Sequence, residues 1–479
     1  MIKRLFSDSV IYGLSGIMSR LFGFLLLPLY SKILLPADYG VLGLYNTTFF
    51  LLSVVLVFGM DSATFRFYYD TEEAAVKKGT TATWLWLQWT LSALLIAISF
   101  LFSKPLGQLI FGLPEAADIL KCLCVVLFLH ALPNIQEVWF RIARKPWSAF
   151  SFAMLITIIN ISVTYYFIVI ARDGYWGFIK GQLVSYGAGT VISLFLLRSS
   201  ISPRYFNGDL LRRMLRYGAP LVPAIFFTLS IPWLCNYFLK SKVNYNELGL
   251  YNMANTFASI LTLVTGSFAQ AFAPFAFSII GKNNARETFA RVFLIYVAGL
   301  SLLCLGYGLF SQEALAVATR PIYSGAWLVM ILLSYHYFFI STASIGVLGT
   351  SIEKKSSPYA IAVLAATITS VILLLVFIPL FGKEGAAIAL LTGQLLIPIM
   401  TFRTSQKFYP IPFAFGSAVA LIGCSVLTIF LVHLLWPVLG LSHGELALGL
   451  LLKVILFLSY CLLTFFFLKK KGLLSLAQT

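Results

Sequence analysis

The chain has 479 residues, of which 60% are hydrophobic and 11% carry a charge, and its mean hydropathy is +0.92. Soluble globular domains hold roughly 45–50% apolar residues, so this composition excludes a soluble domain and predicts a membrane protein that crosses the bilayer many times. The net charge of +17 does not require a nucleic-acid partner, because the basic residues are scattered over short loops, where they can face an anionic lipid leaflet.

A transmembrane helix needs about 20 mostly apolar residues. On this measure the chain contains fourteen predicted spans, at residues 8–31, 39–61, 80–103, 117–140, 148–171, 177–197, 218–239, 248–275, 290–310, 326–349, 358–380, 385–402, 411–436 and 446–468. With the N-terminus inside, 23 of the 34 basic residues fall in cytoplasmic segments and seven on the other side. The positive-inside rule therefore predicts an all-α protein with both termini in the cytoplasm.

Several kinds of chemistry are not expected from this sequence. It lacks a G-x-x-x-x-G-K-[ST] loop for nucleotide phosphates, and its four histidines are widely separated. All six cysteines fall inside predicted spans, so neither a disulfide framework nor a zinc site follows. The longest extramembrane stretch, about residues 198 to 217, is too short for a soluble domain. We expect no catalytic residues, no metal and no cofactor, and hence no enzyme.

The chain shows an internal repeat. Residues 42–46 read Leu-Gly-Leu-Tyr-Asn, and the same five letters return at residues 248–252. A Tyr-Gly pair also occurs at residues 12–13 and again at 217–218, and each pair opens a long apolar stretch. Internal symmetry in a membrane protein is typical of two related helical lobes with a pathway between them.

Charged residues deep in a span indicate a water-filled or inward-facing position, because lipid does not solvate them. Arg20 lies about twelve residues into the first span. One interpretation is a cation that faces a central cavity and attracts an anion, and the other is a structural arginine bonded to carbonyl groups of a neighbouring helix.

Other polar residues in the spans are further candidates. Substrate contact and an ordinary interfacial role are both open for most of them. The candidates for substrate binding, besides Arg20, are Arg66, Gln88, Asn236 and Lys240. Asp61 and Glu137 are candidates for ion coupling, although Glu137 and Arg141 share a helix face and a structural ion pair explains them equally well.

Residues 28–40, Pro-Leu-Tyr-Ser-Lys-Ile-Leu-Leu-Pro-Ala-Asp-Tyr-Gly, resemble the junction of helices 1 and 2 in polysaccharide flippases. Residues 59–69, 217–220 and 249–254 resemble three further segments of the same proteins. The chain is thus similar to Wzx-type members of the multidrug/oligosaccharidyl-lipid/polysaccharide exporter superfamily. The resemblance implies two pseudo-symmetric six-helix lobes around a cationic cavity, at residues 1–200 and 201–410, with two added helices at 411–479.

The function implied by the resemblance is transport. Such proteins move undecaprenyl-pyrophosphate-linked oligosaccharide to the outer leaflet of the bacterial cytoplasmic membrane, for surface polysaccharides such as the O-antigen of lipopolysaccharide. Membrane lipids, a polysaccharide polymerase and glycosyltransferases are the implied partners, and nucleic acid is not. Two residues depart from related patterns. Leu26 stands where lipid II flippases carry a second arginine, and Asn236 stands where Wzx-like proteins commonly carry an acidic residue.

Three alternatives remain open from the sequence. A multidrug or other small-molecule antiporter of the same superfamily normally has twelve spans and central carboxylates. A lipid II flippase is disfavoured by Leu26. A scaffold for a glycan-assembly complex, without transport of its own, would be separated from both by a transport assay.

Overall fold

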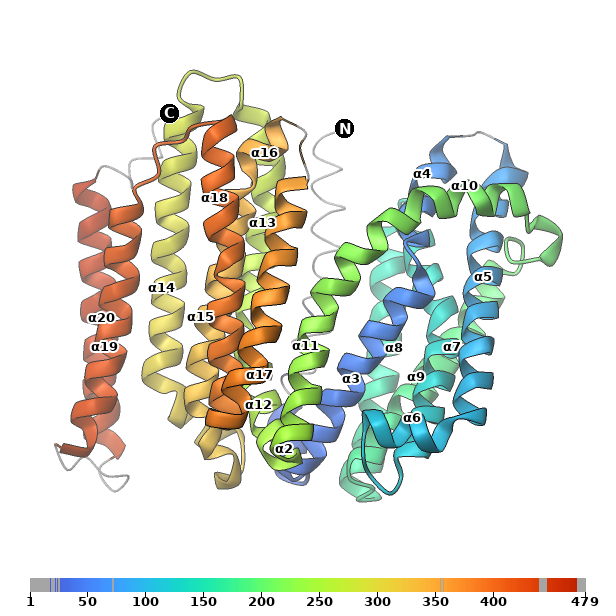
Figure 1. Cartoon of the computed structure of the whole chain (residues 1–479), viewed down its shortest axis with the longest axis horizontal. Coiled ribbons are helices and arrows are strands. Elements are labelled where there is room, and N and C mark those ends of the chain that lie inside the picture. Colours follow the sequence, from blue (N-terminus) through green and yellow to red (C-terminus); the bar gives the residue numbers. More distant parts are fainter. Residues whose placement is uncertain are drawn as a thin grey trace. The chain divides into compact units, whose positions relative to one another are not determined.

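The structure is a computed structural model of the whole chain. It describes residues 26–70, 73–353, 355, 357–438 and 446–471, together with Met18, Phe22 and Phe24. All regular secondary structure in these residues is helical (Figure 1). The first predicted span, residues 8–31, lies mostly outside the described residues, and only its last turn, α2 (Leu27–Ser31), is a described helix.

The chain divides into two compact units, residues 1–249 and 250–479. The first unit contains, after α2, the helices α3 (Pro36–Val57), α4 (Met60–Tyr69), α5 (Ala74–Leu101), α6 (Ser103–Ile110), α7 (Ala116–Ile142), α8 (Pro146–Tyr165), the π-helix η1 (Tyr166–Ile170), α9 (Tyr175–Leu197), the 3-10 turn η2 (Pro203–Tyr205), α10 (Gly208–Gly218), the 3-10 turn η3 (Ala219–Leu221) and α11 (Val222–Lys242). Helix α12 (Tyr245–Ala258) begins in the first unit and continues into the second.

The second unit contains, after the end of α12, the helices α13 (Leu261–Ile279), α14 (Ala285–Ala318), the 3-10 segment η4 (Pro321–Ala326), α15 (Trp327–Gly346), α16 (Leu348–Ile352), α17 (Ser357–Gln394), α18 (Leu396–Phe408), α19 (Phe415–Val438) and α20 (Leu446–Lys470). Two helices join across a kink in α17, where Gly382 has φ 56°. Helices α19 and α20 both pack against α14. The predicted lobe boundaries at residues 200 and 410 follow the repeat and stay predictions.

The described residues contain ten segments that are long and apolar enough to cross a membrane. One of them, Ser357–Phe408, holds two predicted spans, and α9 and α11 match two more, so thirteen of the fourteen predicted spans have a helix in the structure. The prediction of an all-α, multi-pass membrane protein is confirmed, and fourteen spans are compatible with it.

Two features of the helices differ from the predicted elements. The single predicted span at residues 248–275 is two helices, α12 and α13, because the chain turns at residues 259 and 260. The stretch before the seventh span contains an unpredicted amphipathic helix, α10, which lies across the ends of α4 and α5 (Figure 1). Its Leu210 and Met214 are buried, whereas Arg212 and Arg213 are exposed, and Asn207 caps its first turn by accepting a hydrogen bond from the Leu210 N–H.

Close backbone contacts at glycines fix two crossings in the first unit. Gly59, with φ 70°, separates α3 from α4, and a Cβ added to it would lie 2.5 Å from the carbonyl oxygen of Gly218 at the end of α10. A Cβ added to Gly249 of α12 would overlap the Pro36 carbonyl at the start of α3. Only a residue without a side chain allows these approaches.

Candidate functional site

The strongest predicted site residue, Arg20, lies outside the described residues. Its assignment to a cationic cavity therefore stays a prediction. Of the same segment, the structure describes Met18, Phe22 and Phe24 before α2 begins.

Arg66 and Asp61 both lie on the short helix α4. The Arg66 Nε is 3.6 Å from Oδ2 of Asp70, one turn further along, and 64% of the Arg66 side chain is exposed. Asp61 stands in the first turn of α4 and is half-buried. An exposed i,i+4 pair contributes little to stability, so Arg66 is free to exchange Asp70 for another anion.

Gln88 is fully buried on α5, where it belongs to a polar group inside the first unit. Its Oε1 and both amide atoms of Gln136 on α7 have no hydrogen-bond partner among the described residues. The same holds for the Trp84 indole and the Ser92 hydroxyl, which flank Gln88 one turn away on either side. Helix α5 packs along α7, so the interior of the first unit offers donors and acceptors within a membrane-crossing bundle.

A second polar group joins α3, α8 and α9. Asn46, the last residue of the first pentapeptide copy, accepts a long hydrogen bond of 3.5 Å from Gln182 Nε2. Asn160 Nδ2 donates to Ser185 Oγ at 3.1 Å, one turn from Gln182. These contacts tie the repeat sequence to the polar interior of the first unit.

Asn236 and Lys240 lie one turn apart on α11, which packs against α3. The Lys240 Nζ donates to the carbonyl oxygens of Leu109 and Ile110, at 3.3 and 3.2 Å. These carbonyls end helix α6, where the helix dipole favours a cation. Asn236 is buried and donates to the Pro232 carbonyl at 2.8 Å. The ammonium group of Lys240 is thus already used as a helix cap in this structure.

Glu137 and Arg141 form an ion pair, which is one of the two interpretations that the sequence left open for Glu137. Arg141 Nη2 is 3.8 Å from Glu137 Oε2, and 40% of the Glu137 side chain is exposed. The long distance and the exposure are typical of a weak structural pair on one helix face.

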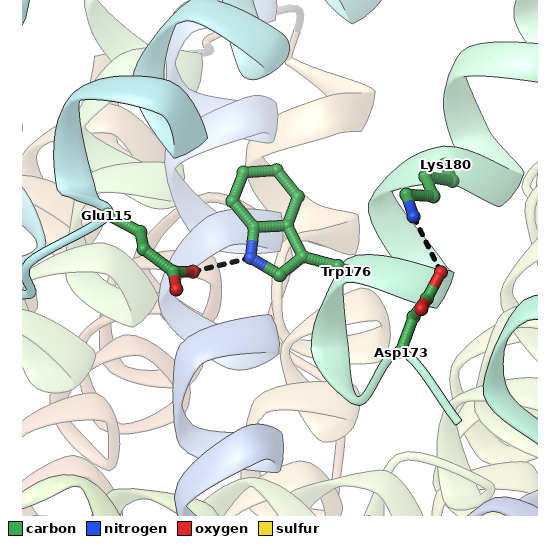
Figure 2. Close-up of polar contacts among 4 residues, drawn as sticks. All are labelled: Glu115, Asp173, Trp176 and Lys180. Carbon is green, nitrogen blue, oxygen red and sulfur yellow. Dashed lines mark hydrogen bonds and ion pairs between the residues drawn. The ribbon is translucent and has the colours of Figure 1, made fainter. Parts of the chain in front are cut away.

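An unpredicted polar cluster joins the start of α7 to the start of α9. The indole Nε1 of Trp176 donates to Glu115 Oε2 at 2.5 Å, and the Tyr175 hydroxyl donates to the same oxygen at 2.7 Å. Figure 2 shows Glu115 and Trp176 facing each other beside the ion pair of Asp173 and Lys180, whose Oδ2 and Nζ are 2.5 Å apart. The two hydrogen bonds lower the pKa of Glu115.

The second unit has a cavity of about 480 Å³ between α13, α15, α16 and the start of α17. Its polar lining is formed by seven hydroxyl side chains and one cation, namely Thr262, Thr265, Ser341, Ser344, Thr350, Ser351, Tyr359 and Lys355. Neutral hydroxyl groups beside a single ammonium suit a ligand with sugar hydroxyls and a phosphate group.

An apolar cleft of about 400 Å³ lies elsewhere in the second unit, between α14, α15, α18 and α19. Phenylalanines from all four helices line it, among them Phe293, Phe338 and Phe402. Arg403 and Gln406 of α18 supply its charged and amide groups. The cleft suits a hydrocarbon chain whose end carries a negative charge.

The described candidates from the sequence do not converge on one point. Arg66, Gln88 and the pair of Asn236 and Lys240 lie on three different helices of the first unit. The sequence reasoning missed Lys355, because it was counted with the cytoplasmic loops. The three-residue spacing of Thr262 with Thr265, and of Ser341 with Ser344, was the available signal for the hydroxyl-lined cavity.

A family model described as "Polysaccharide biosynthesis protein" matches residues 29–332, which is more than half of the chain. The chain belongs to this family. A relative encoded in the Lsg locus of Haemophilus influenzae is 24% identical over 293 residues, which are 59% of this chain and 68% of that protein.

Two solved structures show the same fold. The lipid II flippase MurJ in an inward closed conformation matches with a TM-score of 0.71 at 14% identity, covering 96% of this chain and 99% of that one. An inward-facing multidrug resistance transporter of the MATE family, in the MOP superfamily, matches with a TM-score of 0.64 at 15% identity, covering 82% of this chain and 97% of that one. Identities this low show the fold alone.

These matches confirm the resemblance drawn from the sequence. The chain is a multi-pass membrane protein of the polysaccharide biosynthesis family with the fold of the flippases and exporters of that superfamily. Neither the family nor the fold identifies which residues bind a substrate, since shared folds host different ligands.

Proposed function

We propose that this protein is a flippase. It moves undecaprenyl-pyrophosphate-linked oligosaccharide repeat units from the inner to the outer leaflet of the bacterial cytoplasmic membrane by alternating access, for surface polysaccharide synthesis. The observation that carries the proposal is the match of the polysaccharide biosynthesis family over residues 29–332. Transport requires no covalent step, so the task of the protein is to bind, enclose and release.

The second unit supports this proposal chemically. A lipid-linked oligosaccharide has a long hydrocarbon chain, a pyrophosphate and several sugars. The apolar cleft beside Arg403 fits the chain and its charged end. The hydroxyl-lined cavity with Lys355 fits sugar hydroxyls and phosphate oxygens. Arg20 in the first span is the further cation proposed to bind the pyrophosphate.

Reconstituted protein tests the proposal directly. Liposomes with a fluorescent polyprenyl-pyrophosphate oligosaccharide should show faster transfer of the label to the quencher-accessible leaflet than protein-free liposomes. Labelled lipid II and a cationic dye, offered in parallel, test the lipid II flippase and the multidrug antiporter. Transfer of the dye or of lipid II alone would refute our substrate assignment, and transfer of none of the three would favour a scaffold for the polymerase and glycosyltransferases.

A pair of variants links the assay to the cavity. Lys355→Ala should reduce transfer of the labelled oligosaccharide, because it removes the cation of the hydroxyl-lined cavity. The matched control is Lys407→Ala, which removes an exposed lysine from α18 of the same unit. Equal activity of the two variants would remove Lys355 from the proposed site.

A further inference from the structure

Helix α10 carries a row of exposed arginines. The segment of residues 198–217 holds five arginines and a single acidic residue, Asp209. Arg212, Arg213 and Arg216 follow Asp209 at spacings of three, four and seven residues, so the four side chains share one face of the helix. All four are exposed. The three arginines, which we call the arginine face, have no role in the site described above.

The opposite side of α10 is fixed to the first unit. Leu210 and Met214 are buried in the same apolar core as side chains of α4 and α5. The chain before the helix is held as well, because the Asn207 N–H donates to Thr83 Oγ1 of α5 at 3.2 Å. The helix is therefore fixed in one orientation, with its arginine face directed away from the helices that it packs on.

The arginine face has no ion-pair partner within the part of the chain that the structure describes. This holds even for Asp209, which lies one turn before the arginines. A guanidinium can form two hydrogen bonds to phosphate oxygens at once, and a rigid helix reduces the entropy that is lost when an anion binds. The face therefore suits a partner that presents several phosphate groups.

The position of α10 favours the lipid bilayer as this partner. Helix α10 lies across the ends of α4 and α5 (Figure 1), which belong to the candidate membrane spans Pro36–Tyr69 and Val76–Leu101. A spanning helix ends near the lipid headgroups, so α10 lies close to that level. Phe206 before the helix and Tyr217 in its last turn are 44% and 46% exposed. Exposed aromatic rings beside basic residues are typical of the membrane interface.

We propose that the arginine face of α10 binds the phosphate groups of anionic phospholipids at the membrane surface. A basic residue near an anionic bilayer strengthens binding by about fivefold. A zwitterionic lipid offers the same phosphate but adds a cation that repels the arginines, so the face selects the anionic lipid. The inference goes beyond the proposed transport and is independent of the substrate, because it requires only a multi-pass membrane protein.

A fluorophore beside the arginine face can report which lipid gathers there. Gly208, the first residue of α10, is exposed, and a Cβ at this position meets nothing within 4 Å. Gly208→Cys therefore provides a labelling site without a clash, in the full-length protein without its six native cysteines. The labelled protein is placed in nanodiscs of phosphatidylcholine. Phosphatidylglycerol or phosphatidylcholine with a nitroxide near the headgroup is added as the quencher at increasing mole fraction.

We expect the anionic quencher to act at a mole fraction lower by about tenfold or more than the zwitterionic quencher. About 1 M NaCl should remove most of this difference, because it screens exposed charges beyond about 3 Å. Equal quenching by the two lipids at low salt would show that α10 does not select anionic lipid, and the proposal would be wrong.

Removing the charges tests the arginines themselves. The variant R212Q/R213Q/R216Q should bring the two quenchers to within about twofold of each other. The conservative variant R212K/R213K/R216K should keep most of the preference, because the three charges remain. Both variants leave the buried side of α10 unchanged, and thermal unfolding checks that they fold like the wild type.

The matched control is K282Q/R286Q/R291Q, which removes three exposed basic residues before and at the start of α14. It lowers the net charge by the same amount and should leave the lipid preference at α10 unchanged. If this control loses the preference as fully as R212Q/R213Q/R216Q does, the fluorophore reports net charge only and the proposal is wrong. A preference that survives in R212Q/R213Q/R216Q would also overturn it.

Two other partners of the arginine face give different results. If neither lipid quenches the fluorophore, α10 does not meet the bilayer, and an acidic protein replaces the lipid as the partner. Unlabelled polyprenyl pyrophosphate, added as a competitor, tests the transported substrate. If it relieves quenching by phosphatidylglycerol at a far lower mole fraction than unlabelled phosphatidylglycerol does, the face binds a substrate pyrophosphate and our assignment fails.

Discussion

Glu115 connects the beginnings of two long helices through a single oxygen atom. Trp176 and Tyr175 of α9 both donate to Oε2, and Glu115 directly precedes α7. These bonds require an ionised acceptor for full strength, which is why they lower the pKa of Glu115. Their contribution to stability is present above the unfolded pKa of about 4.3 and is lost as the pH falls through the lower folded value.

Glu115→Gln should therefore lower the thermal unfolding temperature at pH 7 and have little effect at a pH below the lowered pKa of Glu115, where the carboxyl is neutral in both the folded and the unfolded states. Because Glu115 is exposed, we expect a loss well below the roughly 1.5–3 kcal/mol of a buried charged hydrogen bond. Thermal unfolding of the detergent-solubilised protein at both pH values measures this loss of stability. Trp176→Phe should be non-additive with Glu115→Gln, and additive effects would show that the two side chains act separately.

Arg20→Ala should abolish surface polysaccharide in a complementation assay while the protein still accumulates in the membrane. A guanidinium can form two hydrogen bonds to phosphate oxygens at once. In a low-dielectric site it also compensates the negative charge of the pyrophosphate, which water does not solvate there. Arg20→Lys keeps the charge and should retain part of the activity. Normal transport by Arg20→Ala would show that this residue does not contact the substrate, and failure to accumulate would favour its structural interpretation.

At the scale of elements, the crossing of α3 and α12 depends on the absence of a side chain. Gly249→Ala places a methyl group against the Pro36 carbonyl, which cannot move without shifting the start of α3. The cost should exceed the roughly 1–3 kcal/mol of an extra methylene in a packed core, because the obstacle is backbone. Protein level and thermal stability measure the loss.

Gly266→Ala is the matched control, since a Cβ at this position of α13 meets nothing within 4 Å. We expect it to accumulate and unfold like the wild type, as alanine is also the better helix former. Equal behaviour of the two glycine variants would contradict the close crossing.

At the scale of the whole molecule, the orientation in the membrane is the main open prediction. Single cysteines at Lys104 and Arg213, in a background without the native cysteines, test it because both positions are exposed. The positive-inside rule places Arg213 in the cytoplasm and Lys104 outside. A membrane-impermeant thiol reagent should label only the Lys104 position in intact cells, and labelling at Arg213 would reverse the topology.

The sequence by itself determined the all-α, multi-pass architecture and the positions of most of its long helices, because each spanning helix must present apolar residues to lipid over its whole length. It also pointed to individual polar residues, such as Gln88 and Glu137, since charge and amide groups stand out in apolar segments. For Glu137 it supplied the partner too, because Arg141 is one helical turn away.

Only the tertiary structure decided the partners of residues far apart in the chain. Lys240 binds carbonyl groups 130 and 131 positions away, and Lys453 pairs with a carboxylate 140 positions away. It likewise brought the hydroxyl groups of α13, α15 and α16 around one cavity. Hydrophobic periodicity fixes which residues form a helix and which face is apolar, but the choice of neighbouring helix depends on side-chain shape and backbone approach, which no local pattern records.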